Sequence, residues 1–278
     1  MPTLAAKNAL SDEQVQALAM RLLAAKKYRA LELPAETITD LLEANRVHAK
    51  NLAELEKVAR QKLHNIVAPY LEAVDYPAAA QALHALAPGD EAGLRQFSQG
   101  MLQHHASTRE RLPILEAFYA AIFGVTGVPG SLLDLACGFG PFALPWMHLP
   151  PATSYHAYDL HQPRVNLLND YLEKLGRPRL AEKRDILVNP SAQRADVAFF
   201  FKEAHRFEQR QHGCNRSFWE ALNVKYLVVS LPTANLSGSH SMLEGQRILV
   251  QRNIGTYPWK VQEIVLESEI IFCIDKEA

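Results

Sequence analysis

The chain has few of the features that mark a secreted, membrane-bound or strongly cationic protein. Its three cysteines, Cys137, Cys214 and Cys273, lie far apart without a CxxC pair, so we expect no disulfide framework and a cytoplasmic location. No apolar run approaches membrane-spanning length, and residues 1–30 lack the apolar core of a signal peptide. The 29 Lys and Arg residues are balanced by 30 Asp and Glu residues. Any contact with nucleic acid must therefore come from local basic patches.

The texture of the sequence changes near residue 106. A length of 278 residues with 48% hydrophobic content can form two buried cores. Residues 1–105 are rich in Ala, Leu, Glu, Lys and Gln, with apolar positions at threes and fours, which predicts helices. Residues 106–278 contain short apolar runs separated by helical or turn-forming stretches, which is typical of α/β folds. We therefore expect an N-terminal helical domain over 1–105 and an α/β domain over 106–278.

The apolar runs after residue 106 predict the strands of one sheet. In four of the runs, polar and apolar residues barely alternate, so we expect these strands to be buried on both faces. They are 131–136, 155–159, 196–201 and 225–231. A further short strand is expected before Asp185. Runs 262–266 and 270–274 lie so close together that they predict an antiparallel hairpin at one end of the sheet.

The first of these runs leads into a turn typical of nucleotide-binding sites. Gly138 and Gly140 permit a sharp bend and a close approach to a ligand, and Pro141 suits the first position of the following helix. The third glycine of the dinucleotide fingerprint is missing, since Ala143 and Leu144 stand there. A phosphate-free nucleoside therefore fits this turn better than a dinucleotide.

S-adenosylmethionine lacks phosphate, and the sequence offers the groups that its other parts need. Asp159 lies about 20 residues past the turn, the spacing of a ribose-binding acid. Asp185 could meet the adenine edge, with Ile186 on the adenine face. Both aspartates could equally be turn residues at strand ends, a common place for Asp.

Several stretches across the chain carry a resemblance to a known family. They are 26–28, 62–66, 105–111, the glycine turn with 143–145, 155–159, 201–202, 230–233, 236–238 and Met242. In this order they resemble the aminoglycoside-resistance 16S rRNA methyltransferases of the Arm/Rmt group, which modify N7 of a decoding-site guanine. The resemblance implies a Rossmann-like class I methyltransferase domain that holds S-adenosylmethionine, and an N-terminal helical domain that docks on the 30S subunit.

The resemblance also implies residue roles. Arg111 would bind the donor carboxylate, Gly138 would line the methionine moiety, and Asp159 would take the ribose. Asp185 and Ile186 would hold the adenine, while Phe201 and Lys202 would position the reacting centre. The full donor site implied is His105, Thr108, Arg111, Ala136, Gly138, Gly140, Asp159, Leu160, Asp185, Ile186, Phe201 and Lys202. For Arg111, a surface salt bridge is the alternative.

The chain departs from the family pattern in stretches expected to meet RNA. Gly140 replaces the Asn of an Asn-Pro pair, and Ala204 and His205 replace a Leu-Pro pair. The expected basic loop reads Ser239, His240, Ser241, and Leu243 stands in place of a Glu. These departures keep two alternatives open: a methyltransferase acting on another RNA, a protein or a small molecule, or a protein that binds the donor or the ribosome without turnover.

Guanine N7 has an in-plane lone pair and no proton, so methyl transfer needs positioning and no general base. We accordingly assign no acid–base pair, and no metal, because the histidines and cysteines lack ligand spacing. A flipped guanine could stack on an aromatic ring, although each candidate could also be a core residue. The candidates are Phe139, Trp146, Tyr257 and Trp259.

Basic residues in the N-terminal part could follow rRNA phosphates. If residues 36–67 form one helix, a stripe on one face consists of Arg46, Lys50, Lys57, Arg60 and His64. We expect Lys26, Lys27 and Arg29 to extend it. Glu43 and Glu54 near its edge keep open the alternative of a solvated helix face. We expect the protein to act as a monomer.

Overall fold

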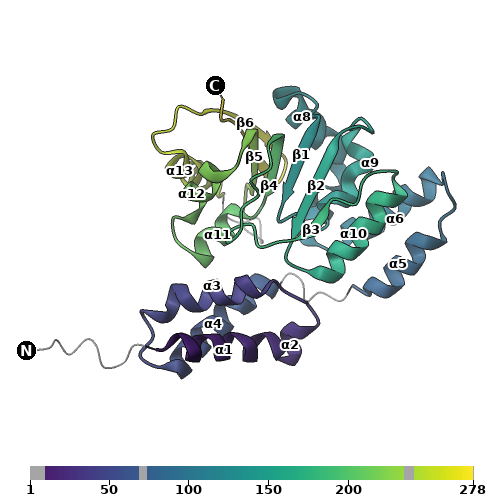
Figure 1. Cartoon of the computed structure of the whole chain (residues 1–278). Helices are drawn as coiled ribbons and strands as arrows, with labels where there is room; N and C mark the ends of the chain where they lie inside the picture. The colour runs from purple at the N-terminus through teal and green to yellow at the C-terminus, as the bar shows by residue number, and fades with distance from the viewer. Residues whose placement is uncertain (1–9, 69–73, 235–240, 278) are drawn as a thin grey trace, which may run out of the picture.

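The computed structural model describes residues 10–68, 74–234 and 241–277, which form a group of N-terminal helices below a larger sheet-containing unit (Figure 1). The N-terminal helices are α1 (Asp12–Ala24), α2 (Lys26–Arg29), α3 (Ala35–Arg46) and α4 (Leu52–Val67). A capping box starts α1, because the Ser11 hydroxyl accepts from the Gln14 backbone and the Gln14 side chain accepts from the Ser11 N–H. Buried residues of these helices form a hydrophobic core separate from those of the sheet.

The expected single helix over residues 36–67 is wrong, because the chain turns back between α3 and α4. Asn51 begins the second helix: its side chain accepts a hydrogen bond from the Glu54 backbone N–H at 2.9 Å. The reversal places Leu41 of α3 and Leu55 of α4 in the same core, at 2% and 0% exposure. Folding back lets the apolar faces of both helices bury each other, which one straight helix cannot do.

A second set of helices leads from the N-terminal group to the sheet. It comprises α5 (Tyr76–Ala85), α6 (Glu91–Gln103), α7 (Ala106–Arg111), the short 3₁₀ helix η3 (Leu112–Ile114) and α8 (Leu115–Thr126). Leu83 of α5 and Leu102 of α6 are fully buried in the core that covers the sheet. By packing, α5 and α6 thus lie with the sheet. The division of the chain at residue 105 stays a prediction.

The sheet confirms the expected α/β, Rossmann-like class. Its strands are β1 (Ser131–Leu135), β2 (Ser154–Asp159), β3 (Ala181–Lys183), β4 (Ala195–Phe201), β5 (Val224–Pro232), β6 (Lys260–Leu266) and β7 (Glu269–Asp275). Their spatial order is β3-β2-β1-β4-β5-β7-β6, with β1 to β5 parallel. The predicted hairpin of β6 and β7 is confirmed, and β7 lies antiparallel between β5 and β6.

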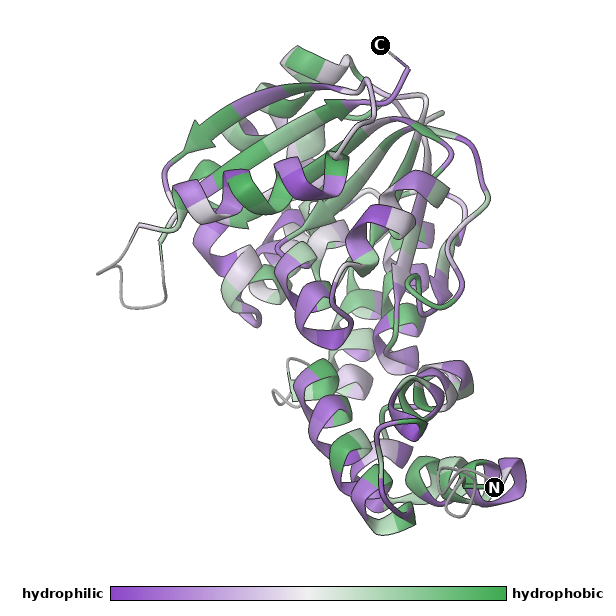
Figure 2. Ribbon diagram, turned by 90° about the vertical axis from the view of Figure 1, so that its left-hand side faces the viewer, coloured by the Kyte–Doolittle hydropathy of each residue, from purple (hydrophilic) through white to green (hydrophobic). Residues whose placement is uncertain are grey.

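Helices cover both faces of the sheet. One face packs against α8, α9 (Leu144–Met147), α10 (Gln162–Lys174) and the 3₁₀ helix η4 (Gly140–Ala143), the other against α11 (Ala204–Arg210), α12 (Cys214–Ala221) and α13 (Leu243–Ile254). Hydropathy colouring shows largely apolar strands beneath helices with polar outer faces (Figure 2). Within the described ranges, no helix is both long and apolar enough to cross a bilayer.

Candidate functional site

The turn after β1 is as tight as its glycines predict. Gly138 has a left-handed backbone with φ of 54°, and the Cys137 N–H donates to the Tyr158 carbonyl at 2.8 Å. A Cβ atom on Gly140 would lie 2.9 Å from Oδ2 of Asp134, so a side chain at this position requires that carboxyl group to move. The role of the turn toward a ligand stays a prediction.

Asp159 ends β2 and points at this turn. Its Oδ2 accepts hydrogen bonds from the Gly138 N–H at 3.0 Å and from Nη1 of Arg164 at 3.2 Å. Its Oδ1 accepts from the His161 N–H at 2.8 Å, a turn-capping contact. The carboxylate therefore both caps the strand end and fixes the glycine turn.

Asp185 follows β3 and likewise caps the turn after its strand. Its Oδ1 accepts from the Leu187 N–H at 3.1 Å and from Nη1 of Arg210 at 3.0 Å. Its Oδ2 accepts from the Thr37 hydroxyl at 2.8 Å. The alternative of turn residues thus applies to both aspartates, and their role toward the ribose and the adenine stays a prediction.

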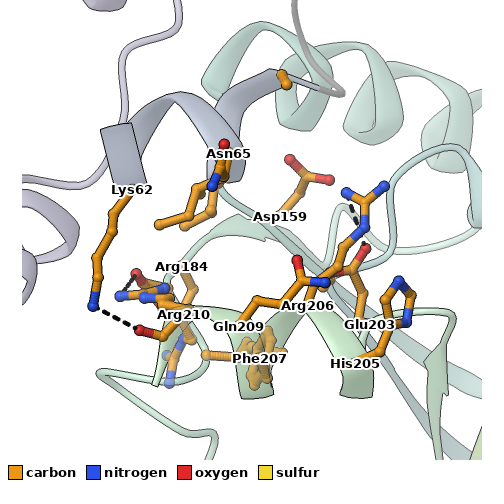
Figure 3. A pocket seen from close by; sticks show the side chains of 16 residues that line it. Lys62, Asn65, Asp159, Arg184, Glu203, His205, Arg206, Phe207, Gln209 and Arg210 are labelled. Atoms are coloured by element: carbon orange, nitrogen blue, oxygen red, sulfur yellow. Dashed lines mark hydrogen bonds and ion pairs between the residues drawn. The ribbon is translucent and has the colours of Figure 1, made fainter. Parts of the chain in front are cut away.

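A cavity of about 410 Å³ lies between α4 and the carboxyl ends of the parallel strands (Figure 3). Its strand-end lining includes Ala136, Asp159, Leu160, Asp185 and Ile186. Lys62 and Asn65 of α4 face Arg206, Gln209 and Arg210 of α11 across it (Figure 3). Ligands of open α/β sheets bind outside the carboxyl ends of the strands, so this is where a cofactor is expected.

A smaller cavity of about 40 Å³ adjoins the first and shares Ala136, Glu203 and Arg206 with it. The residues predicted for the donor site that line it, besides Ala136, are His105, Thr108, Arg111, Gly138, Gly140 and Phe201. The structure therefore brings all the predicted donor residues except Lys202 to one of two adjoining cavities.

Arg111 is buried and pairs with a residue that the sequence did not indicate. Its Nε donates to Glu269 Oε1 at 2.6 Å, and its Nη2 donates to Glu269 Oε2 at 2.9 Å and to the Ser230 hydroxyl at 3.0 Å. Burial raises the pKa of Glu269, but the charge and hydrogen bonds of Arg111 outweigh it and bring that pKa below its usual value. The alternative of a surface salt bridge for Arg111 is wrong, because its side chain is only 4% exposed.

Phe201 and Lys202 follow each other at the end of β4 but face different neighbours. The Phe201 ring lies 4.7 Å from the Arg111 guanidinium. Lys202 has a left-handed backbone with φ of 56°, and its Nζ lies 2.6 Å from Glu110 and 3.2 Å from Glu269. Lys202 therefore belongs to the ion-pair network behind the smaller cavity, and its role beside the reacting centre stays a prediction.

Sequence reasoning missed the residues that α11 and its N-terminus contribute, namely Glu203, His205, Arg206, Gln209 and Arg210. Their position directly after β4 is a signal that could have found them, because the ends of parallel strands meet at one edge. Burial raises the pKa of Glu203 to about 7, and burial followed by the charge of Arg206 lowers the pKa of His205 to about 4. His205 is thus neutral at pH 7.

Of the aromatic candidates for stacking on a target base, only Phe139 lines either cavity. Trp146 is 8% exposed and packs beneath the guanidinium of Arg95 at 4.4 Å. Tyr257 and Trp259 stack on each other, with ring centres 4.4 Å apart. These last three pack in or against the hydrophobic cores, which agrees with the alternative of a core role, and their stacking on a target base stays a prediction.

The stripe of basic residues expected along one helix does not form, because its members lie on two helices and the loop between them. Arg46 pairs with Asp12 at 2.6 Å, and Arg60 pairs with Glu56 at 2.8 Å. His64 on α4 lies 3.0 Å from Lys27 Nζ on α2. The role of these residues toward RNA, together with Lys26, Arg29, Lys50 and Lys57, stays a prediction.

The positions at which the chain departs from the Arm/Rmt pattern lie in different parts of the structure. Ala204 is buried under the sheet and His205 lines the larger cavity. Ser239 and His240 lie outside the described residues. Leu243 begins α13 and packs against the core on that face of the sheet, so its apolar side chain has a structural partner.

No group of three or more His, Cys, Asp or Glu side chains suited to a metal ion occurs in the ranges that the structure describes. The three cysteines are buried and unpaired with one another. His105 caps α7: its Nδ1 accepts from the Ser107 N–H at 3.4 Å and lies 2.7 Å from the Ser107 hydroxyl. Burial, followed by the charge of Arg164, lowers the pKa of His105 to about 4.

Solved structures of similar sequence share this fold. The 16S rRNA methyltransferase RmtF in complex with S-adenosyl-L-homocysteine superposes with a TM-score of 0.78 at 27% identity, covering 96% of this chain and 99% of that one. The 16S rRNA methylase RmtB gives a TM-score of 0.76 at 26% identity, with 95% and 98% coverage.

Curated relatives bear one activity name. A 16S rRNA (guanine(1405)-N(7))-methyltransferase of Frankia casuarinae is 31% identical over 86% of both chains. The protein of that name from Micromonospora rosea is 28% identical over 95% of this chain and 98% of its own. The model of the family described as ribosomal RNA methyltransferase (FmrO) matches residues 24–273. The chain therefore belongs to the FmrO family of ribosomal RNA methyltransferases.

Proposed function

We propose that this protein transfers the methyl group of S-adenosylmethionine to N7 of guanine 1405 in 16S rRNA, the reaction named for its relatives. The observation that carries the proposal is the cavity of about 410 Å³ beside the glycine turn, with Asp159 and Asp185 at its strand ends. Its volume lies within the range of about 300–1,000 Å³ that is usual for small-molecule sites.

The side chains around the cavities match the parts of the donor. Asp159 would accept hydrogen bonds from the ribose hydroxyls, and Ile186 would pack on the adenine beside Asp185. The backbone at Gly138 would line the methionine moiety, and Arg111 would attract its carboxylate. His105 and His205, each with a pKa of about 4, are uncharged at neutral pH and so do not repel a cationic sulfonium.

The reaction requires the protein only to position the donor and the target base. Bound S-adenosylmethionine supplies an electrophilic methyl group on sulfur. The lone pair of guanine N7 forms the new N–C bond while the C–S bond electrons go to sulfur, and no proton moves. The residues beside the smaller cavity, Phe201 and Lys202 among them, would hold the base in line with the methyl group, because alignment lowers the barrier without any acid or base.

The N-terminal helices would dock on the assembled 30S subunit. Lys26, Lys27 and Arg29 on α2 are the basic cluster expected to meet rRNA phosphates, which position a protein without specifying sequence. Turning the guanine out of its stack costs a few kcal/mol, which contacts with the folded subunit would offset. We further propose that the protein acts as a monomer in the cytoplasm and confers aminoglycoside resistance.

Two measurements test this function. Isothermal titration calorimetry should show S-adenosylhomocysteine binding, and primer extension should show a donor-dependent modification at guanine 1405 of purified 30S subunits. Expression in a susceptible host should then permit growth on gentamicin and kanamycin. Donor binding without any modified subunit would contradict the proposal and support a binding protein, while transfer to another substrate would support a methyltransferase of different specificity.

A further inference from the structure

The guanidinium of Arg210 connects the lining of the larger cavity, of about 410 Å³, to the N-terminal helices. Arg210 ends α11, and its side chain is 6% exposed. Its Nη1 lies 3.0 Å from Asp185 Oδ1 and its Nη2 lies 2.8 Å from Asp185 Oδ2, a two-pronged pair with a carboxylate that lines the cavity. The same Nη2 donates to Oδ2 of Asp40, on α3, at 3.0 Å.

Other contacts tie the same helices to the same cavity wall. Thr37 lies one turn before Asp40 on α3, is fully buried, and donates its hydroxyl hydrogen to Asp185 Oδ2 at 2.8 Å. Lys62 of α4, which lines the cavity, donates to the Arg210 carbonyl at 3.3 Å. Leu160, also in the cavity lining, packs against the core of the N-terminal helices.

We propose that Arg210 is a positioning residue that couples donor binding to the docking of the N-terminal helices. Asp185 is held by the Leu187 N–H and by Arg210, and Thr37 of α3 adds a hydrogen bond to its Oδ2, so the carboxylate has all of its contacts only while α3 stays in place. The α4 wall of the cavity is held by the hydrogen bond from Lys62 to the Arg210 carbonyl. Donor binding and helix docking therefore strengthen each other, since a coupling between two sites acts equally in both directions.

This inference rests on the proposed function, because the donor must occupy the cavity for the coupling to act. With the donor bound, the protein would hold its N-terminal helices against the cavity wall and present them to the ribosome in one fixed orientation. The helices would then act as part of the donor site as well as the RNA-docking surface.

Matched substitutions on α3 test the coupling by calorimetry with S-adenosylhomocysteine. Asp40→Asn removes the negative charge that pairs with Arg210, and Thr37→Val removes the hydrogen bond to Asp185, so each should weaken binding roughly tenfold. Their controls are Glu43→Gln and Thr39→Val on the same helix. Glu43 pairs with Arg46 at 3.3 Å and the Thr39 hydroxyl donates to the Ala35 carbonyl at 3.2 Å, so neither contact reaches the cavity, and binding should match the unmodified protein.

The conservative variant Arg210→Lys separates positioning from charge. Lysine keeps the positive charge but cannot bind a carboxylate through two parallel hydrogen bonds while also reaching a second one, so donor binding should weaken. In that background Asp40→Asn should have little further effect, whereas two independent structural defects would add.

Hydrogen exchange supplies the reverse measurement. Saturating S-adenosylhomocysteine should slow amide exchange in α3 and α4 of the unmodified protein, and this protection should shrink in Asp40→Asn. Donor binding by the unmodified protein with no change in any α3 variant, and with no protection of α3 and α4, would overturn the coupling alone. Absence of donor binding by the unmodified protein would overturn the proposed function and the coupling together.

Discussion

Arg111 and Glu269 form a buried ion pair across 158 residues of sequence, with Nε and Oε1 2.6 Å apart and side-chain exposures of 4% and 0%. The pair joins α7 to the first residue of β7. A second nitrogen of Arg111 reaches the other carboxylate oxygen, so the geometry is that of a strong two-pronged pair. The donor carboxylate proposed for Arg111 would therefore meet a guanidinium whose position is already fixed by the protein.

Breaking this pair from one side should destabilise the protein strongly. Glu269→Gln leaves the buried Arg111 charge without its counter-ion, and we expect a loss of about 3–5 kcal/mol in the free energy of unfolding. Urea unfolding followed by circular dichroism measures it. The control is Glu263→Gln on β6, whose partner Arg247 is 41% exposed, and we expect a loss below about 1 kcal/mol there. Equal losses in the two variants would contradict the prediction.

Asp159→Asn should weaken donor binding, and it should also lower stability, because Arg164, which pairs with Asp159 at 3.2 Å, is buried too. The substitution removes the negative charge that accepts from Gly138 and Arg164 and that we expect to accept from the ribose. Hydrogen bonds to charged groups contribute about 1.5–3 kcal/mol, so the Kd for S-adenosylhomocysteine should rise by one to two orders of magnitude. Calorimetry measures it, with Asp170→Asn on the outer surface of α10 as the control. An unchanged Kd in Asp159→Asn would remove this residue from the donor site.

The Glu203 carboxyl should make stability fall as the pH rises. Burial raises its pKa from 4.5 to about 7. Between these values the folded protein retains a proton that the unfolded chain has released, so this contribution is full below pH 4.5 and is lost by about pH 7. Glu203→Gln does not titrate and should exceed the unmodified protein in stability above pH 7, by up to about 3 kcal/mol.

Urea unfolding of both proteins across this pH range checks the Glu203 prediction. The two stability curves should draw apart as the pH rises. Asp134, whose pKa burial also raises to about 7, contributes equally to both curves and cancels in their difference. Curves that run parallel throughout would show that Glu203 titrates normally.

Gly140→Ala should disturb the turn without any change of charge. The added Cβ would lie 2.9 Å from the Asp134 carboxylate, which itself accepts a hydrogen bond from the Tyr155 hydroxyl at 2.5 Å. We expect a loss of roughly 1–3 kcal/mol from overpacking, and weaker donor binding. In the control Gly245→Ala, the new Cβ has no neighbour within 4 Å, and helix propensity should leave stability equal or higher. Thermal unfolding and calorimetry distinguish the two variants.

The strands could be predicted from the sequence because their environment is uniform. Runs such as 131–136 and 225–231 are apolar on both sides, as parallel strands covered by helices must be. The observed β1 is one residue shorter than its run, and β5 is one residue longer at each end. The glycine turn and the two strand-end aspartates were also predictable, since local spacing determines them.

The break between α3 and α4 escaped prediction because apolar spacing alone does not show where a helix turns back. Asn51 was a usable signal, since Asn is a preferred N-cap residue. The long-range pairs were beyond local reasoning: Arg210 meets Asp40 across 170 residues, and Arg111 meets Glu269 across 158. Such partners are set by the packing of whole elements, which no spacing in the sequence expresses.

The interior position of β7 has a consequence for biosynthesis. A chain is synthesised from its N-terminus, so α7 is complete long before β7. The Arg111 guanidinium can therefore pair with the Glu269 carboxylate only after β7 has been synthesised. Only when β7 inserts between β5 and β6 does the sheet become continuous and the Arg111 guanidinium gain the partner that fixes its position. Nascent chains that still lack this strand should therefore have no finished smaller cavity.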